Sequence, residues 1–302
     1  MSIPRIDFLI PGAGKSGTSA IAQYLKSHPQ VFIPRIKEPT YFTFADAEIP
    51  AYTERLNAIH NFEDYCRLFS EAGDKKAIGE ASTYYFLLPE RSIANIKRII
   101  PDYQRIKIII ILRNPVDRAF SQYMMLKLNK WESLSFEDAI SEKTINRRMA
   151  ENYGPSYNYL EEGLYCYRIK AFQENFPFMK IYLYEDLCGN PTGLMDDILS
   201  FLDVAPGNNW RTHRKKVNPS GIPRIKFLHD FLIKPGGIIK SLGKTVIPPE
   251  MRRGIKDRMI SLNLKRDAMR PATRALLTDY YEEEIRNLEG IIGRDLSHWL
   301  KK

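Results

Sequence analysis

The sequence has few cysteines and no long hydrophobic run. Its 302 residues include three cysteines, an odd number without the spacing of a disulfide framework or a zinc site, which favours a reducing compartment. The longest aliphatic run, residues 106–112, is interrupted by Lys107 and is too short to span a bilayer. An apolar run begins at Ile6, which leaves no room for a signal peptide before it. We therefore expect a soluble, cytoplasmic protein.

The sequence also lacks linkers, internal repeats and low-complexity tracts. No Gly/Ser-rich or Pro-rich segment divides it, and 44% of its residues are hydrophobic, enough for a large core. We expect one domain over residues 1–302. It would consist of an α/β core at 6–205 and a basic, mainly helical capping region at 206–302.

The positive charge is distributed unevenly. The net charge is +9, yet residues 211–274 alone hold 17 Lys/Arg against 4 Asp/Glu, so the rest of the chain carries a net −4. Such a local excess indicates an anionic partner for this segment. The alternative is a basic helical surface that is merely solvated.

Apolar runs alternate with helical patterns along the first two thirds of the chain. The predicted strands are residues 7–10, 31–33, 77–80, 107–112 and 180–184. The predicted helices are residues 18–27, 62–71, 90–100, 114–128, 163–176, 196–202 and 271–292. This alternation predicts an α/β fold with a P-loop-like central parallel sheet of about five strands, flanked by helices, and a helical C-terminal region.

Residues 6–23 form the most informative stretch of the chain. An apolar run ends at Pro11-Gly12-Ala13-Gly14, and a helical pattern starts at Thr18. A glycine-rich turn between a strand and a helix lets backbone N–H groups and the helix dipole bind an anion, and Lys15 adds a full positive charge. The pattern predicts a phosphate site, with an ordinary strand-to-helix turn as the alternative.

A nucleoside-triphosphatase loop is the nearest competing interpretation, because Gly14-Lys15-Ser16 matches the end of that motif. The full motif needs a glycine five residues before the Gly-Lys pair, where this chain has Leu9. The later strand ends in Arg113, not in an Asp that would hold Mg²⁺. An arginine there can bind an anion directly; otherwise it could pair with Asp117.

Together these segments resemble the PAPS-dependent sulfotransferases, especially the heparan-sulfate and bacterial carbohydrate-type branch. PAPS is adenosine with a 5′-phosphosulfate and a 3′-phosphate. Residues 14–19 resemble the family's 5′-phosphosulfate loop, and residues 109–123 resemble its 3′-phosphate motif. Residues 37–42 resemble its catalytic segment, and residues 218–224 resemble the loop that closes over the nucleotide.

The resemblance implies a role for each matching residue. Lys15 would stabilise the departing phosphate, and Arg113 and Ser121 would bind the 3′-phosphate. The 5′-phosphate would lie on the loop made of Gly14, Lys15, Ser16, Gly17, Thr18 and Ser19. The closing loop would contribute Ser220, Gly221 and Arg224. PAPS would be the donor and adenosine 3′,5′-bisphosphate the product, without a metal.

Glu38 is the candidate general base. It precedes Pro39, which favours an extended backbone able to present the carboxylate to a cleft; a solvated glutamate beside Lys37 is the alternative. Glu80 at the end of the third strand is the competing carboxylate, and with Ser82 a candidate substrate contact. Animal members often have a lysine directly after this glutamate, where this chain has Ala81.

The predicted reaction is in-line transfer of a sulfonate group from PAPS to a hydroxyl, or an amine, of a carbohydrate or related metabolite. The runner-up is a P-loop kinase or ATPase acting on ATP–Mg²⁺. A nucleic-acid-binding protein is the third interpretation, but the basic segment has few interleaved aromatic residues, so we expect no nucleic-acid partner. The basic segment could instead bind an anionic saccharide, or dock on a membrane through residues 222–247.

Overall fold

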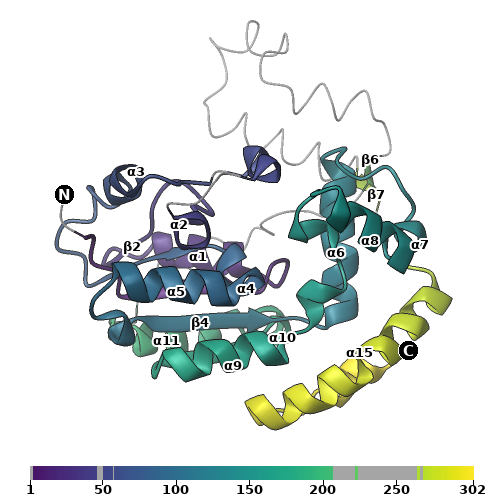
Figure 1. The fold of residues 1–302 in the computed structure, drawn as a ribbon. Helices are drawn as coiled ribbons and strands as arrows, with labels where there is room; N and C mark the ends of the chain where they lie inside the picture. Colours follow the sequence, from purple (N-terminus) through teal and green to yellow (C-terminus); the bar gives the residue numbers. More distant parts are fainter. Residues whose placement is uncertain (1–2, 46–49, 57, 207–221, 224–263, 266–267) are drawn as a thin grey trace, which may run out of the picture.

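A five-stranded parallel sheet forms the centre of the computed structural model, which describes residues 3–45, 50–56, 58–206, 222–223, 264–265 and 268–302. The strand order is β2-β3-β1-β4-β5 (Figure 1). The strands are β1 (Phe8–Gly12), β2 (Val31–Phe32), β3 (Ala77–Ala81), β4 (Lys107–Leu112) and β5 (Met179–Leu183). The predicted α/β fold with about five parallel strands is confirmed.

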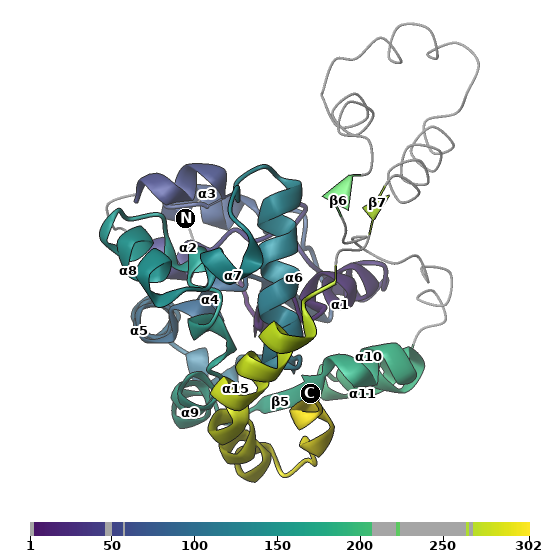
Figure 2. The same ribbon diagram turned by 90° about the vertical axis from the view of Figure 1, so that its right-hand side faces the viewer.

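Helices cover both faces of this sheet, and a two-stranded pair, β6 (Ile222–Pro223) with β7 (Leu264–Lys265), lies outside it. Figure 2 shows α5 and α9 on one side and α1, α10 and α11 on the other. The helices are α1 (Thr18–Lys26), α2 (Tyr41–Phe44), α3 (Phe62–Arg67), α4 (Tyr84–Leu87), α5 (Pro89–Ile99), α6 (Pro115–Leu128), α7 (Phe136–Ala139), α8 (Glu142–Ala150), α9 (Cys166–Asn175), α10 (Tyr184–Gly189), α11 (Pro191–Phe201) and α15 (Pro271–Ile292).

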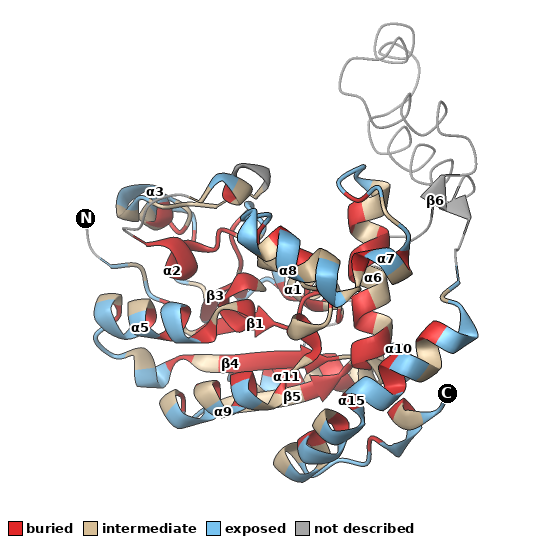
Figure 3. Cartoon of the chain, turned by 45° about the vertical axis from the view of Figure 1, so that its right-hand side comes forward, coloured by how far each residue is buried: buried red, intermediate tan, exposed pale blue. Residues whose placement is uncertain are grey.

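The sequence of strand β4 is apolar at successive positions, and its residues face two different parts of the core in turn. Ile108, Ile110 and Leu112 face the core under α5, α9 and α15, whereas Ile109 and Ile111 face the core under α1 and α11. All five side chains are fully buried, and the strands form the buried centre of Figure 3. A central parallel strand has two buried faces, so hydrophobic residues on both sides of the pleat stabilise it.

The connections of the sheet change direction between β1 and β4. The chain leaves β1 through α1 towards β2, and it leaves β4 through α6 towards β5, on the other side. Ligands of open α/β sheets bind at the carboxyl ends of the strands beside such a point. The Gly12 turn and Arg113 follow β1 and β4, so this topology places both at one edge of the sheet.

The structure corrects several predicted boundaries. The helix predicted at residues 163–176 begins at Cys166, and Tyr184 starts α10 instead of ending β5. Helix α11 begins at Pro191, five residues before the predicted start, because the Asn190 side chain accepts a hydrogen bond from the Gly193 N–H and caps it. The C-terminal helix, α15, has the predicted bounds. No helix in the described part of the chain is long and apolar enough to cross a membrane.

Candidate active site at the carboxyl edge of the sheet

The loop between β1 and α1 offers backbone donors that have no partner among the described residues. Gly17 has a φ of 106°, a left-handed conformation that favours glycine, and it caps α1 without a side-chain hydrogen bond. Its carbonyl accepts the first helical hydrogen bonds, from the N–H groups of Ala20 and Ile21. The N–H groups of Thr18 and Ser19 precede them, at the positive end of the helix dipole. These donors suit an anion.

Ser16 adds a polar atom to the same loop. Its side chain is fully buried, and its Oγ has no hydrogen-bond partner among the described residues. A buried hydroxyl without a partner costs free energy unless a ligand or water completes its hydrogen bonds. Ser16 therefore supports the interpretation of this loop as a binding site.

Lys15 lies at the centre of a group of cations. Burial, together with repulsion from Lys37, Arg113 and Arg118 and against attraction by Glu162, lowers the pKa of Lys15 to about 8. Arg113 Nη1 donates a hydrogen bond to the Lys15 carbonyl at 3.3 Å, and this bond joins the β1 loop to the end of β4. A bound anion would relieve this repulsion and stabilise the charged ammonium.

Arg113 at the end of β4 contacts an aromatic ring and a backbone carbonyl. Its guanidinium carbon lies 4.6 Å from the centre of the Tyr184 ring, and its carbonyl accepts a hydrogen bond from the Tyr165 hydroxyl at 2.8 Å. The alternative pairing with Asp117 is absent, because Asp117 binds Arg274 at 2.5 Å. Among the described ion pairs, none contains Arg113. The tip of β4 thus presents a planar cation that forms no ion pair with a carboxylate in the described part of the chain.

Ser121 lies on α6, about two helical turns after Arg113, and its side chain is half-buried. No hydrogen bond links Ser121 to Arg113 in the described structure. Their joint contact with a 3′-phosphate therefore stays a prediction.

Glu38 is held in place by Thr83. Its Oε2 accepts hydrogen bonds from the Thr83 N–H at 2.6 Å and from Thr83 Oγ1 at 2.9 Å, and Lys37 Nζ lies 3.9 Å from Oε1. Burial raises the pKa of Glu38, while Lys37 and the Thr83 hydrogen bonds act against this shift. The side chain keeps 24% exposure, so a substrate can reach it. A carboxylate of raised pKa is a better general base.

The competing carboxylate, Glu80, lies in the core. It is 1% exposed, and its carboxylate accepts hydrogen bonds from the hydroxyls of Tyr65, Tyr85 and Ser82 at 2.7–2.8 Å. Burial raises the pKa of Glu80 to about 7, and these hydrogen bonds oppose the shift. Ser82 is also fully buried. Contact of Glu80 or Ser82 with an acceptor remains an untested prediction that their burial does not favour.

A buried ion pair behind the loop was not predicted from the sequence. Arg118 on α6 donates to Glu162 Oε2 at 2.8 Å and to the Tyr159 carbonyl, and both charged side chains are almost fully buried. A Cβ on Gly14 would lie 2.5 Å from Glu162 Oε1, so the pair fills the space that a larger loop residue would need. The partners are 44 residues apart, and no local pattern links them.

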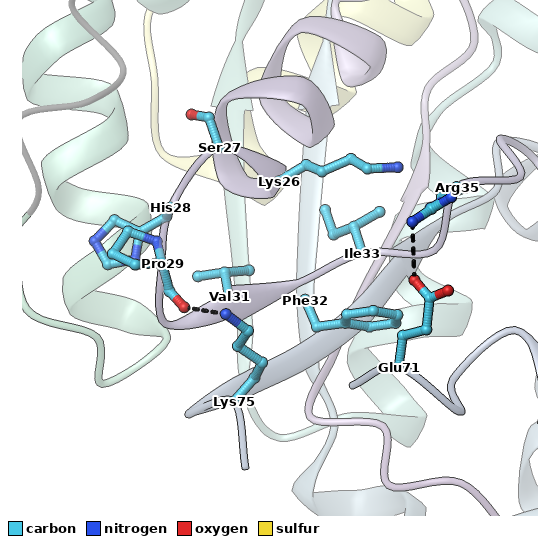
Figure 4. Close-up of a pocket in the computed structure, with 10 residues that line it drawn as sticks. All are labelled: Lys26, Ser27, His28, Pro29, Val31, Phe32, Ile33, Arg35, Glu71 and Lys75. Carbon is cyan, nitrogen blue, oxygen red and sulfur yellow. Dashed lines mark hydrogen bonds and ion pairs between the residues drawn. The ribbon is translucent and has the colours of Figure 1, made fainter. Parts of the chain in front are cut away.

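A separate cavity of about 270 Å³ lies at the other end of α1, beside β2 (Figure 4). Its cations already have partners: Lys26 Nζ donates to the Pro34 carbonyl at 3.0 Å, Lys75 Nζ to the Pro29 carbonyl at 2.5 Å, and Arg35 pairs with Glu71 at 3.3 Å. It contains none of the predicted site residues.

Two groups of predicted residues cannot be placed. Ser220, Gly221 and Arg224 of the expected closing loop lie outside the described residues, as does almost all of the expected membrane segment 222–247. In the described ranges, no group of three or more His, Cys, Asp or Glu side chains is arranged to hold a metal ion.

Comparison with known proteins gives consistent results. The family model described as "Sulfotransferase family" matches residues 7–206. A membrane-associated sulfotransferase, kil1, of Dictyostelium discoideum is 32% identical over 143 residues, 45% of this chain and 28% of its own length. Human bifunctional heparan sulfate N-deacetylase/N-sulfotransferase 2 is 26% identical over 213 residues, 67% of this chain and 22% of its own length. The chain thus spans less than a third of these relatives.

A solved structure matches over the whole chain. The crystal structure of a sulfotransferase from Alicyclobacillus acidocaldarius aligns with a TM-score of 0.72 and 29% identity, covering 99% of this chain and 100% of that one. The family resemblance inferred from the sequence motifs is confirmed.

Proposed function

Because the chain belongs to the sulfotransferase family, we propose that it transfers a sulfonate group from PAPS to a hydroxyl or amine of a carbohydrate or related metabolite. The proposal is supported above all by the placement of Lys15 and Arg113 at one edge of the sheet. They follow the adjacent strands β1 and β4, and the Arg113 guanidinium donates a hydrogen bond to the Lys15 backbone carbonyl, in the loop that leads into the N-terminus of α1. This edge offers separate cationic positions for the two phosphates of the donor.

In the proposed reaction the acceptor atom attacks sulfur, and the bond between sulfur and the bridging oxygen breaks. Glu38 takes the acceptor's proton. Lys15 stabilises the negative charge that develops on the departing 5′-phosphate, so the products are the sulfated acceptor and adenosine 3′,5′-bisphosphate. The N–H groups of Thr18 and Ser19 hold the 5′-phosphate, and Arg113 and Ser121 hold the 3′-phosphate. Ser220, Gly221 and Arg224 close the site.

The kinase or ATPase alternative is not favoured. The site has Leu9 where a triphosphatase loop has its first glycine, and β4 ends in Arg113 instead of an Mg²⁺-binding Asp.

The acceptor class rests on the relatives, which include a heparan sulfate enzyme. The basic segment 211–274 would bind an anionic saccharide or a membrane surface, and one of the relatives is named as membrane-associated.

A transfer assay with sulfur-labelled PAPS tests this function. The protein would be incubated in EDTA with a panel of acceptors, including heparosan oligosaccharides with free and acetylated amines and simple alcohols. We expect label to move to at least one acceptor while adenosine 3′,5′-bisphosphate accumulates. No transfer to any acceptor, together with thermal stabilisation by ATP–Mg²⁺ but not by the bisphosphate, would support the kinase alternative instead.

A further inference from the structure

The segment that carries Glu38 has an unfavourable backbone conformation. Glu38 and Thr40 have φ values of 56° and 54°, in the left-handed region that non-glycine residues rarely adopt, so the extended backbone expected for Glu38 before Pro39 is wrong. Such a conformation costs free energy, so the surrounding contacts must hold it. The contacts that hold this segment therefore determine where the Glu38 carboxylate lies.

Two consecutive residues after β3 make these contacts. Thr83 binds the Glu38 carboxylate through its N–H and its hydroxyl. Ser82 Oγ accepts a hydrogen bond from the Thr40 N–H at 3.1 Å, on the other side of Pro39. The strained segment is thus anchored at both ends to the same short turn.

Glu80 in turn fixes Ser82. The Ser82 hydroxyl donates to Glu80 Oε2 at 2.8 Å, which directs its lone pairs towards the Thr40 N–H. Glu80 Oε1 accepts from the hydroxyls of Tyr65 and Tyr85, so the carboxylate itself cannot rotate without losing these hydrogen bonds. Above its pKa of about 7 the Glu80 carboxylate is charged, and a charged acceptor makes stronger hydrogen bonds than a neutral one.

We propose that Glu80 is a positioning residue, which acts through Ser82 and Thr40 to hold Glu38 in its strained conformation at the acceptor. This inference rests on the proposed role of Glu38 as general base. Glu80 cannot replace Glu38, because all its hydrogen bonds point into the core and its side chain is closed to substrate. Its pKa of about 7, raised by burial, is then a consequence of its place in the core and not a sign of proton transfer with the acceptor.

The test compares Ser82→Ala and Glu80→Gln with the unmodified protein, using the acceptor of highest turnover in the panel above. Ser82→Ala removes the acceptor of the Thr40 N–H, and Glu80→Gln removes the charge that orients Ser82. Because misplacement by about 1 Å can cost about 10²-fold in rate, we expect kcat to fall about 10- to 100-fold in Ser82→Ala and less in Glu80→Gln. The KM for PAPS should change less than about 2-fold, since the Lys15 loop is untouched.

A matched control separates positioning from general destabilisation. Ser92 on α5 is another fully buried serine, and its Oγ lies 3.0 Å from Thr43 Oγ1 on α2, with no hydrogen bond to Ser82, Thr83 or Glu38 among the described residues. Ser92→Ala should lower the melting temperature about as much as Ser82→Ala while kcat stays at the level of the unmodified protein. Equal losses of kcat in the two variants would show that the effect of Ser82 is only structural.

A double-mutant cycle with Glu38→Gln decides whether Ser82 and Glu80 act through Glu38. If they do, adding Ser82→Ala or Glu80→Gln to Glu38→Gln should not lower the residual kcat further. The inference fails if the losses multiply, or if both single variants keep full kcat. The role of Glu38 as general base, on which the inference rests, fails separately if Glu38→Gln alone keeps full turnover, and the proposed sulfonate transfer fails if no acceptor of the panel is sulfated.

Discussion

Replacing Lys15 with Ala is expected to lower kcat about 10³-fold while the protein stays folded. Removal of one group that stabilises charge in the transition state costs about 10²–10³ in kcat, and removal of a full positive charge from a phosphate site can cost more. Lys15 belongs to no apolar face, and its left-handed backbone, with a φ of 67°, is tolerated in a loop. The measurement is kcat for sulfonate transfer, with circular dichroism to check the fold.

Lys26, at the other end of α1, provides the control. Its Nζ donates to the Pro34 carbonyl, far along the helix from the loop, so Lys26→Ala should keep kcat near the level of the unmodified protein. If Lys15→Ala loses no more activity than Lys26→Ala, Lys15 takes no part in the transition state.

The pH profile gives a second signature of Lys15. Its pKa of about 8 in the free protein means that the ammonium is charged below pH 8 and neutral above it. Only the charged form stabilises the leaving phosphate, so kcat/KM for PAPS should fall as the pH rises through about 8. Lys15→Ala should lack this descending limb. A descending limb that persists in Lys15→Ala would assign the titration to another group.

The second large effect is expected for Glu38→Gln, which should lower kcat about 10²–10⁴-fold, the usual contribution of a general base. Glutamine has the same shape, and its side-chain oxygen can still accept the two hydrogen bonds of Thr83, so the segment keeps its place. The nucleotide loop is not altered. Thermal stabilisation by adenosine 3′,5′-bisphosphate should therefore equal that of the unmodified protein.

A Glu38→Gln variant with nearly full turnover would contradict the assignment of the base. The sequence left Glu80 as the substitute, but that carboxylate is 1% exposed and fully hydrogen-bonded. Nearly full turnover without the Glu38 carboxylate would therefore indicate an acceptor that needs no base from the protein, such as an amine already neutral at the assay pH.

The elements that were predicted correctly are determined by residues that lie close together in the sequence. The runs before Gly12 and Arg113 are apolar at successive positions because both faces of a central parallel strand are buried. The turn of Gly12 to Gly17 combines glycines, a lysine and a helix start within one segment. Such features depend on local chemistry, so the sequence alone places the sheet, the loop and the cations at one edge.

The features that were missed depend on contacts between distant segments. The pairs Arg118–Glu162 and Glu38–Thr83 join residues 44 and 45 positions apart. Glu80 at a strand end has the position of a catalytic acid or base, and only the packing of Tyr65 and Tyr85 around it shows that it is buried. The start of α11 was a different kind of error, since the Asn190-Pro191 cap is visible in the sequence.

We expect this edge of the sheet to bind the 3′-phosphate and 5′-phosphate of one nucleotide without a metal. The direct measurement is calorimetric titration in EDTA of the unmodified protein and Arg113→Ala with adenosine 3′,5′-bisphosphate and with 5′-AMP. We predict that the bisphosphate binds more tightly than 5′-AMP, and that Arg113→Ala loses about 10- to 100-fold of the bisphosphate affinity, which corresponds to one charged hydrogen-bonding contact. Equal affinities for the two nucleotides, unaffected by Arg113→Ala, would contradict the claim.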